Sequence, residues 1–210
     1  MVKSAVVPEY WKVACDNLAK QDRVLKQLIA EYKDASLRSR GSAFETLLRA
    51  IVGQQISVKA AQSVWDRFES RVEVVSTESV LAHPPEVLQS CGLSRQKVVY
   101  MQDLARHFET GAINPRRFKS LGDEDLIKSL CNVRGIGRWT AEMFLIFHLR
   151  RPDVYPLQDI GLIRAVERHY LGGRKASSEE VSEIGERWRP WRTVATWYLW
   201  RSLDPFPVEY

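Results

Sequence analysis

The chain has 210 residues, enough for one domain or for two small lobes. Its net charge of +5 and isoelectric point near 9.2 favour an anionic partner. No apolar run approaches the length that crosses a bilayer, which excludes a membrane-spanning protein.

The three cysteines, Cys15, Cys91 and Cys131, are far apart and form no C-x-x-C or other metal-binding spacing. The first seven residues lead directly into Pro8 and give no signal-peptide pattern. We therefore expect a reduced, cytoplasmic location.

Apolar residues recur at helical spacing along the N-terminal half of the chain. Asp22, Ser57 and Ser94 are suited to cap helices that follow them, and Gly92 to end one. The helices predicted here cover residues 8–20, 22–32, 42–52, 57–69, 74–82, 84–91 and 94–107.

The C-terminal half continues the pattern, and Pro190 suits the first position of the last helix. The predicted helices cover residues 114–118, 123–130, 138–149, 159–170, 178–188 and 190–202. The helix from residue 138 should bury Ala141, Phe144, Leu145 and either His148 or Leu149. We find essentially no strand pattern, repeat or low-complexity segment, so the predicted fold is all-α.

Residues 130–159 hold the most informative pattern. Gly135-Ile136-Gly137 separates two helical patterns, and glycine allows positive φ and close approach of another backbone or a phosphate. The second helix presents its unpaired N–H groups at the same place, between Arg134 and Arg138. This favours a helix-hairpin-helix that holds a nucleic acid phosphate without reading sequence. A plain helix connection is the alternative, because Gly-x-Gly alone is a weak signal.

The longer pattern resembles the helix-hairpin-helix DNA glycosylase superfamily, in particular the 3-methyladenine DNA glycosylase II family. The resemblance covers roughly residues 44–202. Its motifs are Val133-Arg134-Gly135-Ile136-Gly137-Arg138-Trp139-Thr140-Ala141, Pro156-Leu157-Gln158-Asp159-Ile160-Gly161-Leu162, the segment 49–61, Gly92-Leu93-Ser94-Arg95-Gln96-Lys97 and Trp188-Arg189-Pro190-Trp191-Arg192. Arg134 departs from the family, which usually has Pro there. The four-cysteine iron–sulfur loop of a related branch is absent.

The resemblance implies two helical lobes. Residues 37–151 would form the lobe with the hairpin, and residues 1–36 with 152–210 would form the second. The active cleft would lie between them, where ligand sites often sit.

Asp159 precedes a predicted helix, and by residue type alone it is best explained as an N-cap. The resemblance places it at the catalytic aspartate of the family. The two roles are compatible, because the helix dipole favours an ionised carboxylate there.

The resemblance also implies a substrate pocket formed by Trp139, Met143 and Trp200. Relatives that also nick the strand have a lysine at the position of Trp139, and tryptophan cannot form the imine that they use. An electron-poor alkylated purine would stack well on an aromatic ring. Ordinary core packing is the alternative for Trp139 and for the C-terminal tryptophans, and Trp191 is expected to pack rather than bind.

For DNA binding, the resemblance points to Arg134, Gly135, Gly137, Arg138 and Thr140. It places Gln55 at the side chain that fills the gap left by a flipped base; a surface loop residue is an equal alternative. Lys59, Arg95 and Lys97 are weaker candidates, for phosphate contact or solvation. The family's hairpin also binds a structural ion, monovalent or Mg²⁺, through backbone carbonyls. By position these belong to Cys131, Val133 and Ile136. No catalytic metal or other cofactor is expected.

The predicted function is that of a monofunctional DNA glycosylase. It would release alkylated purines of the 3-methyladenine or 7-methylguanine type from duplex DNA, as a monomer associated with the nucleoid if bacterial. The alternatives are a related glycosylase for deaminated or oxidised bases and a non-catalytic DNA-binding module. Only the module would have no need of Asp159.

Overall fold

The computed structural model describes residues 7–33, 36–37 and 41–203. Its contacts divide the chain into two compact units. We call residues 40–144 the hairpin unit, and residues 1–39 with 145–209 the Asp159 unit. The predicted lobes end at residues 36 and 151, whereas the contacts divide the chain after Ser39 and within a helix, after Phe144. The predicted cleft between lobes stays a prediction.

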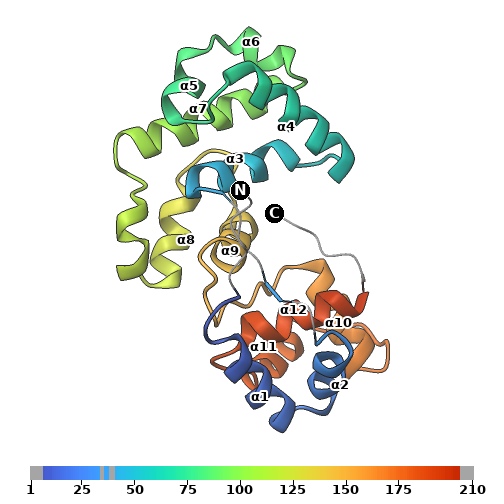
Figure 1. The fold of residues 1–210 in the computed structure, drawn as a ribbon. Coiled ribbons are helices and arrows are strands. Elements are labelled where there is room, and N and C mark those ends of the chain that lie inside the picture. The colour runs from blue at the N-terminus through green and yellow to red at the C-terminus, as the bar shows by residue number, and fades with distance from the viewer. Residues whose placement is uncertain (1–6, 34–35, 38–40, 204–210) are drawn as a thin grey trace. The chain divides into compact units, whose positions relative to one another are not determined.

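The hairpin unit is built around α3, which packs against α4 and α7, while α5 and α6 also pack on α7 (Figure 1). Its elements are α3 (Ala43–Gly53), α4 (Val58–Val72), α5 (Thr77–Ala82), α6 (Pro85–Ser90), α7 (Arg95–Glu109), the 3₁₀ helix η1 (Pro115–Ser120), α8 (Asp123–Cys131) and most of α9 (Arg138–Phe147). Leu47, Leu48 and Ile51 of α3 are fully buried, so this helix is the centre of the unit's core.

The Asp159 unit joins the two ends of the chain. Helices α1 and α2 pack on α12, which also packs on α10 (Figure 1, blue against red and orange). Its helices are α1 (Trp11–Gln21), α2 (Arg23–Glu31), α10 (Ile160–Tyr170), α11 (Ser178–Glu186) and α12 (Arg192–Leu203). Trp188 and Tyr198 are almost fully buried, and Trp188 donates a hydrogen bond through Nε1 to Asp22 Oδ2 at 3.0 Å.

The all-α prediction is confirmed over the described residues. Local sequence signals explain most helix ends. Asp22, Ser57 and Ser94 each accept a backbone N–H from the third residue of the helix they cap, and Gly92 has φ +94°. In the same residues, no helix is long and apolar enough to cross a bilayer.

Several predicted helix bounds are wrong, and two of them bear on the site. Helix α12 begins at Arg192, so Pro190 lies before the helix and not at its first position; the Arg189–Pro190 peptide is cis. Helix α9 ends at Phe147 and buries Ala141 through Phe147 on all sides, whereas His148 and Leu149 lie beyond it and are half-buried. Periodicity alone overran the helix because apolar residues continue past its last turn.

Candidate active site and nucleic acid interface

The two glycines of the hairpin turn have different roles. Gly135 has φ +83°, and a Cβ there would lie 2.1 Å from Cδ2 of Tyr100, so only glycine fits over that ring. A Cβ on Gly137 would meet no atom within 4 Å. Gly135 is therefore required by the fold of the turn, whereas Gly137 keeps open the surface that a phosphate would approach.

Helix α7 supports the hairpin turn from within the same unit. Asp103 accepts the backbone N–H of Arg134 through Oδ2 at 2.9 Å, and Tyr100 packs under Gly135. The Arg134 side chain is exposed, as a phosphate contact requires. The usual proline at this position has no N–H, so Arg134 gives the turn a tie that proline could not make.

Arg138 does not add the net positive charge that the sequence pattern suggests. Its guanidinium is hydrogen-bonded to the carboxylate of Glu124, and its Nε lies 3.0 Å from Glu142 Oε1. The bonded Glu124 raises the pKa of Arg138, and Arg138 lowers the pKa of Glu124. The charge that faces an approaching phosphate thus comes mainly from backbone N–H groups and Arg134.

The turn after α3 presents Gln55. Its side chain is exposed and its backbone has φ +60°, which is uncommon for a residue other than glycine. The neighbouring Gln54 donates from Nε2 to the carbonyl oxygen of Gly135 at 2.7 Å. Lys97 donates from Nζ to the carbonyl of Val52 at 2.7 Å, and burial lowers its pKa, so this lysine supports α3 rather than standing in solvent. Lys59 and Arg95 are exposed.

Asp159 caps α10, as its residue type predicts. Its Oδ1 accepts the backbone N–H of Leu162 at 2.6 Å and the indole Nε1–H of Trp200 at 2.7 Å. The side chain is half-buried. A Cβ on Gly161 would come within 3.0 Å of Asp159 Oδ1 and 3.1 Å of Trp200 Cδ1, so this glycine permits the close approach. The carboxylate is held at a helix N-terminus in one orientation.

Trp200 was predicted as a pocket aromatic, and its main observed contact is this bond to Asp159. Its ring also stacks on Phe147, with centroids 5.8 Å apart and planes 11° from parallel. Phe147 is a site residue that the sequence did not reveal, because it reads as one more apolar residue of α9. Trp191 stacks instead on Tyr10, at 5.9 Å, as expected of a packing residue.

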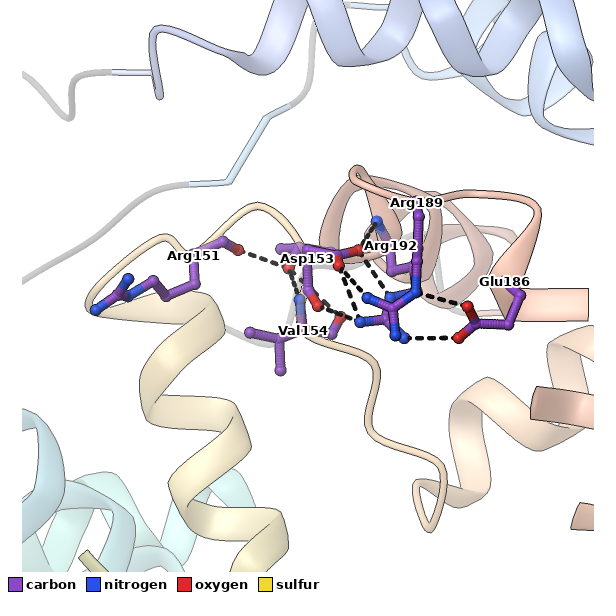
Figure 2. Close-up of polar contacts among 7 residues, drawn as sticks. Arg151, Asp153, Val154, Glu186, Arg189 and Arg192 are labelled. Carbon is purple, nitrogen blue, oxygen red and sulfur yellow. Dashed lines mark hydrogen bonds and ion pairs between the residues drawn. The ribbon is translucent and has the colours of Figure 1, made fainter. Parts of the chain in front are cut away.

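An ion-pair network holds the segment that leads to Asp159 (Figure 2). Asp153 accepts from Arg192 Nε at 2.7 Å and Nη2 at 2.9 Å, and Arg189 Nη1 reaches the same carboxylate at 2.7 Å. Glu186 bonds both arginines from the other side. Thr193 donates to the carbonyl of Arg151 and accepts the N–H of Val154. The backbone is thus fixed six residues before Asp159.

The predicted residues of α9 lie in the first turns of the helix. Trp139 is 39% exposed, which excludes the core-packing alternative for it. Met143 and Thr140 are buried, at 5% and 8% exposure. Only Trp139 of this group offers a large surface for contact.

The hairpin carbonyls are compatible with a bound cation. Cys131 is the last residue of α8, where carbonyls lack a partner in the next turn and the helix dipole favours positive charge. The carbonyl of Val133 accepts the N–H of Ile136 at 3.1 Å, which leaves its second lone pair for a ligand.

Comparisons with known proteins identify the family of this chain. The model of the HhH-GPD superfamily base excision DNA repair proteins matches residues 48–190. The chain is 31% identical to DNA-3-methyladenine glycosylase 1 of Schizosaccharomyces pombe, over 85% of this chain and 80% of that protein. It is 29% identical to the putative DNA-3-methyladenine glycosylase YfjP of Bacillus subtilis, over 86% of this chain and 66% of that protein.

Two solved structures are similar over nearly the whole chain. The DNA-3-methyladenine glycosidase of Bacillus halodurans has a TM-score of 0.83 and 32% identity, covering 94% of this chain and 92% of that one. The 3-methyladenine DNA glycosylase of S. pombe, solved in complex with abasic DNA, has a TM-score of 0.76 and 29% identity, covering 93% and 99%. With the family model matched over more than half of its length, the chain belongs to the HhH-GPD superfamily of base excision DNA repair proteins.

Proposed function

We propose that this protein is a monofunctional DNA glycosylase that hydrolyses the N-glycosidic bond of alkylated purines in duplex DNA. The observation that carries the proposal is the carboxylate of Asp159, held at the N-terminus of α10 by Leu162 and Trp200. The relatives named as 3-methyladenine glycosylases support the choice of alkylated purines.

Cleavage of the N-glycosidic bond requires little more from the protein than a fixed negative charge near the deoxyribose. The C1′–N bond breaks with its electron pair leaving on the base, and positive charge develops on the deoxyribose. A carboxylate about 4 Å away stabilises that charge by roughly 4 kcal/mol at an effective dielectric near 20, on the order of a thousandfold in rate. Water then bonds to C1′ and loses a proton, for which Asp159 is the proposed acceptor.

Selection of the lesion rests on its chemistry as well as on contact. An alkylated purine is often cationic and leaves more readily than a normal base. The exposed indole of Trp139 is the proposed stacking surface, with Met143 beside it on α9. Because Trp139 is not a lysine, no imine to the sugar forms at this position, and the product is an intact strand with an abasic site.

The hairpin is the proposed phosphate site. Gly135, Gly137 and the first N–H groups of α9 would hold the phosphate, with Arg134 and Thr140 next to them. We also propose that the carbonyls of Cys131, Val133 and Ile136 would hold a structural monovalent or Mg²⁺ ion, which would supply positive charge beside the phosphate site. We propose no catalytic metal, and a monomeric enzyme located with the DNA in the cytoplasm.

The test is incubation with duplex DNA that carries methylated purines, followed by alkali. We expect free 3-methyladenine or 7-methylguanine in the supernatant and strand breaks only after alkali. Breaks before alkali would show a lyase activity and contradict the monofunctional mechanism. No released base, together with unchanged duplex binding, would favour a non-catalytic binding module. Release of deaminated or oxidised bases alone would assign another lesion class.

A further inference from the structure

Gln54 links two turns that are 81 residues apart in the sequence, through its bond to the carbonyl of Gly135. We propose that Gln54 is a positioning residue that fixes the Gln55 turn to the glycine turn of the hairpin. Under this proposal, the side chain that fills the gap of a flipped nucleotide and the amides that hold the phosphate meet the duplex as one rigid surface. The inference rests on the proposed function and on Gln55 as the side chain that fills the place of the flipped nucleotide.

The Gln55 turn needs support from outside. Gln54 has φ −57° and ψ 132°, and Gln55 follows with φ +60°. These three angles match a type II turn, in which the second central residue is normally Gly or Asn. A long exposed side chain at that position is held in a conformation that an isolated turn would not keep. The Gln54 amide supplies a fixed point one residue before it.

The partner of Gln54 is equally constrained. The Gly135 carbonyl belongs to a turn whose φ of +83° is set over the Tyr100 ring, and the N–H of the preceding Arg134 is bonded to Asp103. The acceptor carbonyl therefore lies in a turn that is fixed on both sides of Gly135. If the Gly135 carbonyl were mobile, a hydrogen bond to it could not fix the position of Gln54.

Both turns rest on the same helix. Lys97 of α7 bonds the carbonyl of Val52 at the end of α3, and one and two turns further along, Tyr100 and Asp103 hold the hairpin. Residues spaced by three are neighbours on a helix surface, so Tyr100 lies next to both Lys97 and Asp103. Helix α7 therefore provides the base of the platform, and Gln54 closes it at the surface that faces solvent.

This coupling matters for base flipping in particular. Flipping a nucleotide costs unstacking and unpairing energy, which a held phosphate and a side chain in the vacated place would offset together. If the Gln55 side chain moves independently, the entropic cost of ordering it is incurred each time the protein binds a lesion. Contact with an intact duplex needs only the phosphate site, so it should not depend on Gln54.

The experiment is a double-mutant cycle with Gln54→Ala, Gln55→Ala and the double variant. The probe is a duplex with a tetrahydrofuran abasic-site analogue next to 2-aminopurine, whose fluorescence reports unstacking. We expect Gln54→Ala to lower the preference for this duplex over an intact one by about tenfold, the size of one well-made hydrogen bond. In the Gln55→Ala background, Gln54→Ala should lower this preference by less than about twofold, because the side chain that Gln54 positions is absent.

Three outcomes would overturn the proposal. They are additive effects of the two changes, an equal loss of affinity for the intact duplex, and an unchanged preference. Thermal melting checks that the variants fold. If Gln54→Ala does not fold, Gln54→Met replaces it, because methionine keeps the side-chain length without the hydrogen-bond donor. The experiment measures binding and not base release. Absence of base release by the unmodified protein would therefore contradict the proposed function without deciding this inference.

Discussion

The two units hold their functional loops by different means. In the hairpin unit the glycine turn is fixed through its backbone: Asp103 bonds an N–H, Gln54 bonds a carbonyl, and Tyr100 fills the place of a missing Cβ. In the Asp159 unit the loop is fixed by side-chain charges around Asp153, and Asp159 itself by the Trp200 indole.

The difference follows from what each loop has to do. A phosphate is bound by backbone N–H groups, so that site depends on backbone geometry more than on the side chains around it. Charge on a sugar is stabilised by one carboxylate, so the second site depends on the chemistry and orientation of a side chain. Substitutions that change backbone geometry should therefore do most harm in the hairpin unit, and substitutions that change charge should do most harm in the Asp159 unit.

The largest expected effect is that of Asp159→Asn. Asparagine caps helices as well as aspartate does, so stability should change by less than about 1 kcal/mol. The negative charge is lost, so single-turnover release of 3-methyladenine should fall by about a thousandfold, or roughly 4 kcal/mol. If the loss of folding free energy accounted for the whole loss of activity, Asp159 would serve only as a cap.

Gly135→Ala should cost about 3 kcal/mol of folding free energy, because its Cβ meets the Tyr100 ring at positive φ. Gly137→Ala is the matched control, since its Cβ would stand in open space. Urea denaturation should show a loss for the first variant and almost none for the second. Duplex binding at low salt should be weakened by Gly137→Ala, and more by Gly137→Asp, which sets a carboxylate against the phosphate.

Asp153→Asn should destabilise the protein by about 2 kcal/mol, because Arg192 and Arg189 lose a shared, largely buried carboxylate. Base release should fall with it, while binding to an intact duplex should stay within about twofold. A binding defect as large as the catalytic defect would contradict the division of labour between the units.

Trp200→Phe removes the Nε1–H donor to Asp159 but keeps a ring to stack on Phe147. Loss of one charge-assisted hydrogen bond that orients the carboxylate should slow base release by about tenfold. Should the rate be unchanged, the indole would act only as a pocket wall.

The smallest effect is expected of Arg138→Gln. Its ion pair with the exposed Glu124 contributes about 0.2–1 kcal/mol to folding, and glutamine keeps an amide N–H that can donate to the buried Glu142 carboxylate. The two carboxylates already balance the charge of Arg138, so the salt dependence of duplex binding should hardly change. Arg134→Gln is the comparison, and it should lower the salt slope by about one ion. A larger slope change for Arg138 would restore it as a phosphate contact.

By itself the sequence determined the all-α fold, nearly every helix, the caps at Asp22, Ser57 and Ser94, and the glycine hairpin, because these depend on local periodicity and on side chains that bond neighbouring backbone. It also gave Asp159 its place before a helix. Tertiary structure decided what no local pattern contains. It brought Trp200 to Asp159 and Gln54 to Gly135, each from far along the chain, and it set Glu124 against Arg138. Such contacts are made by packing, which joins residues according to the shape of the folded chain and not to their distance in sequence.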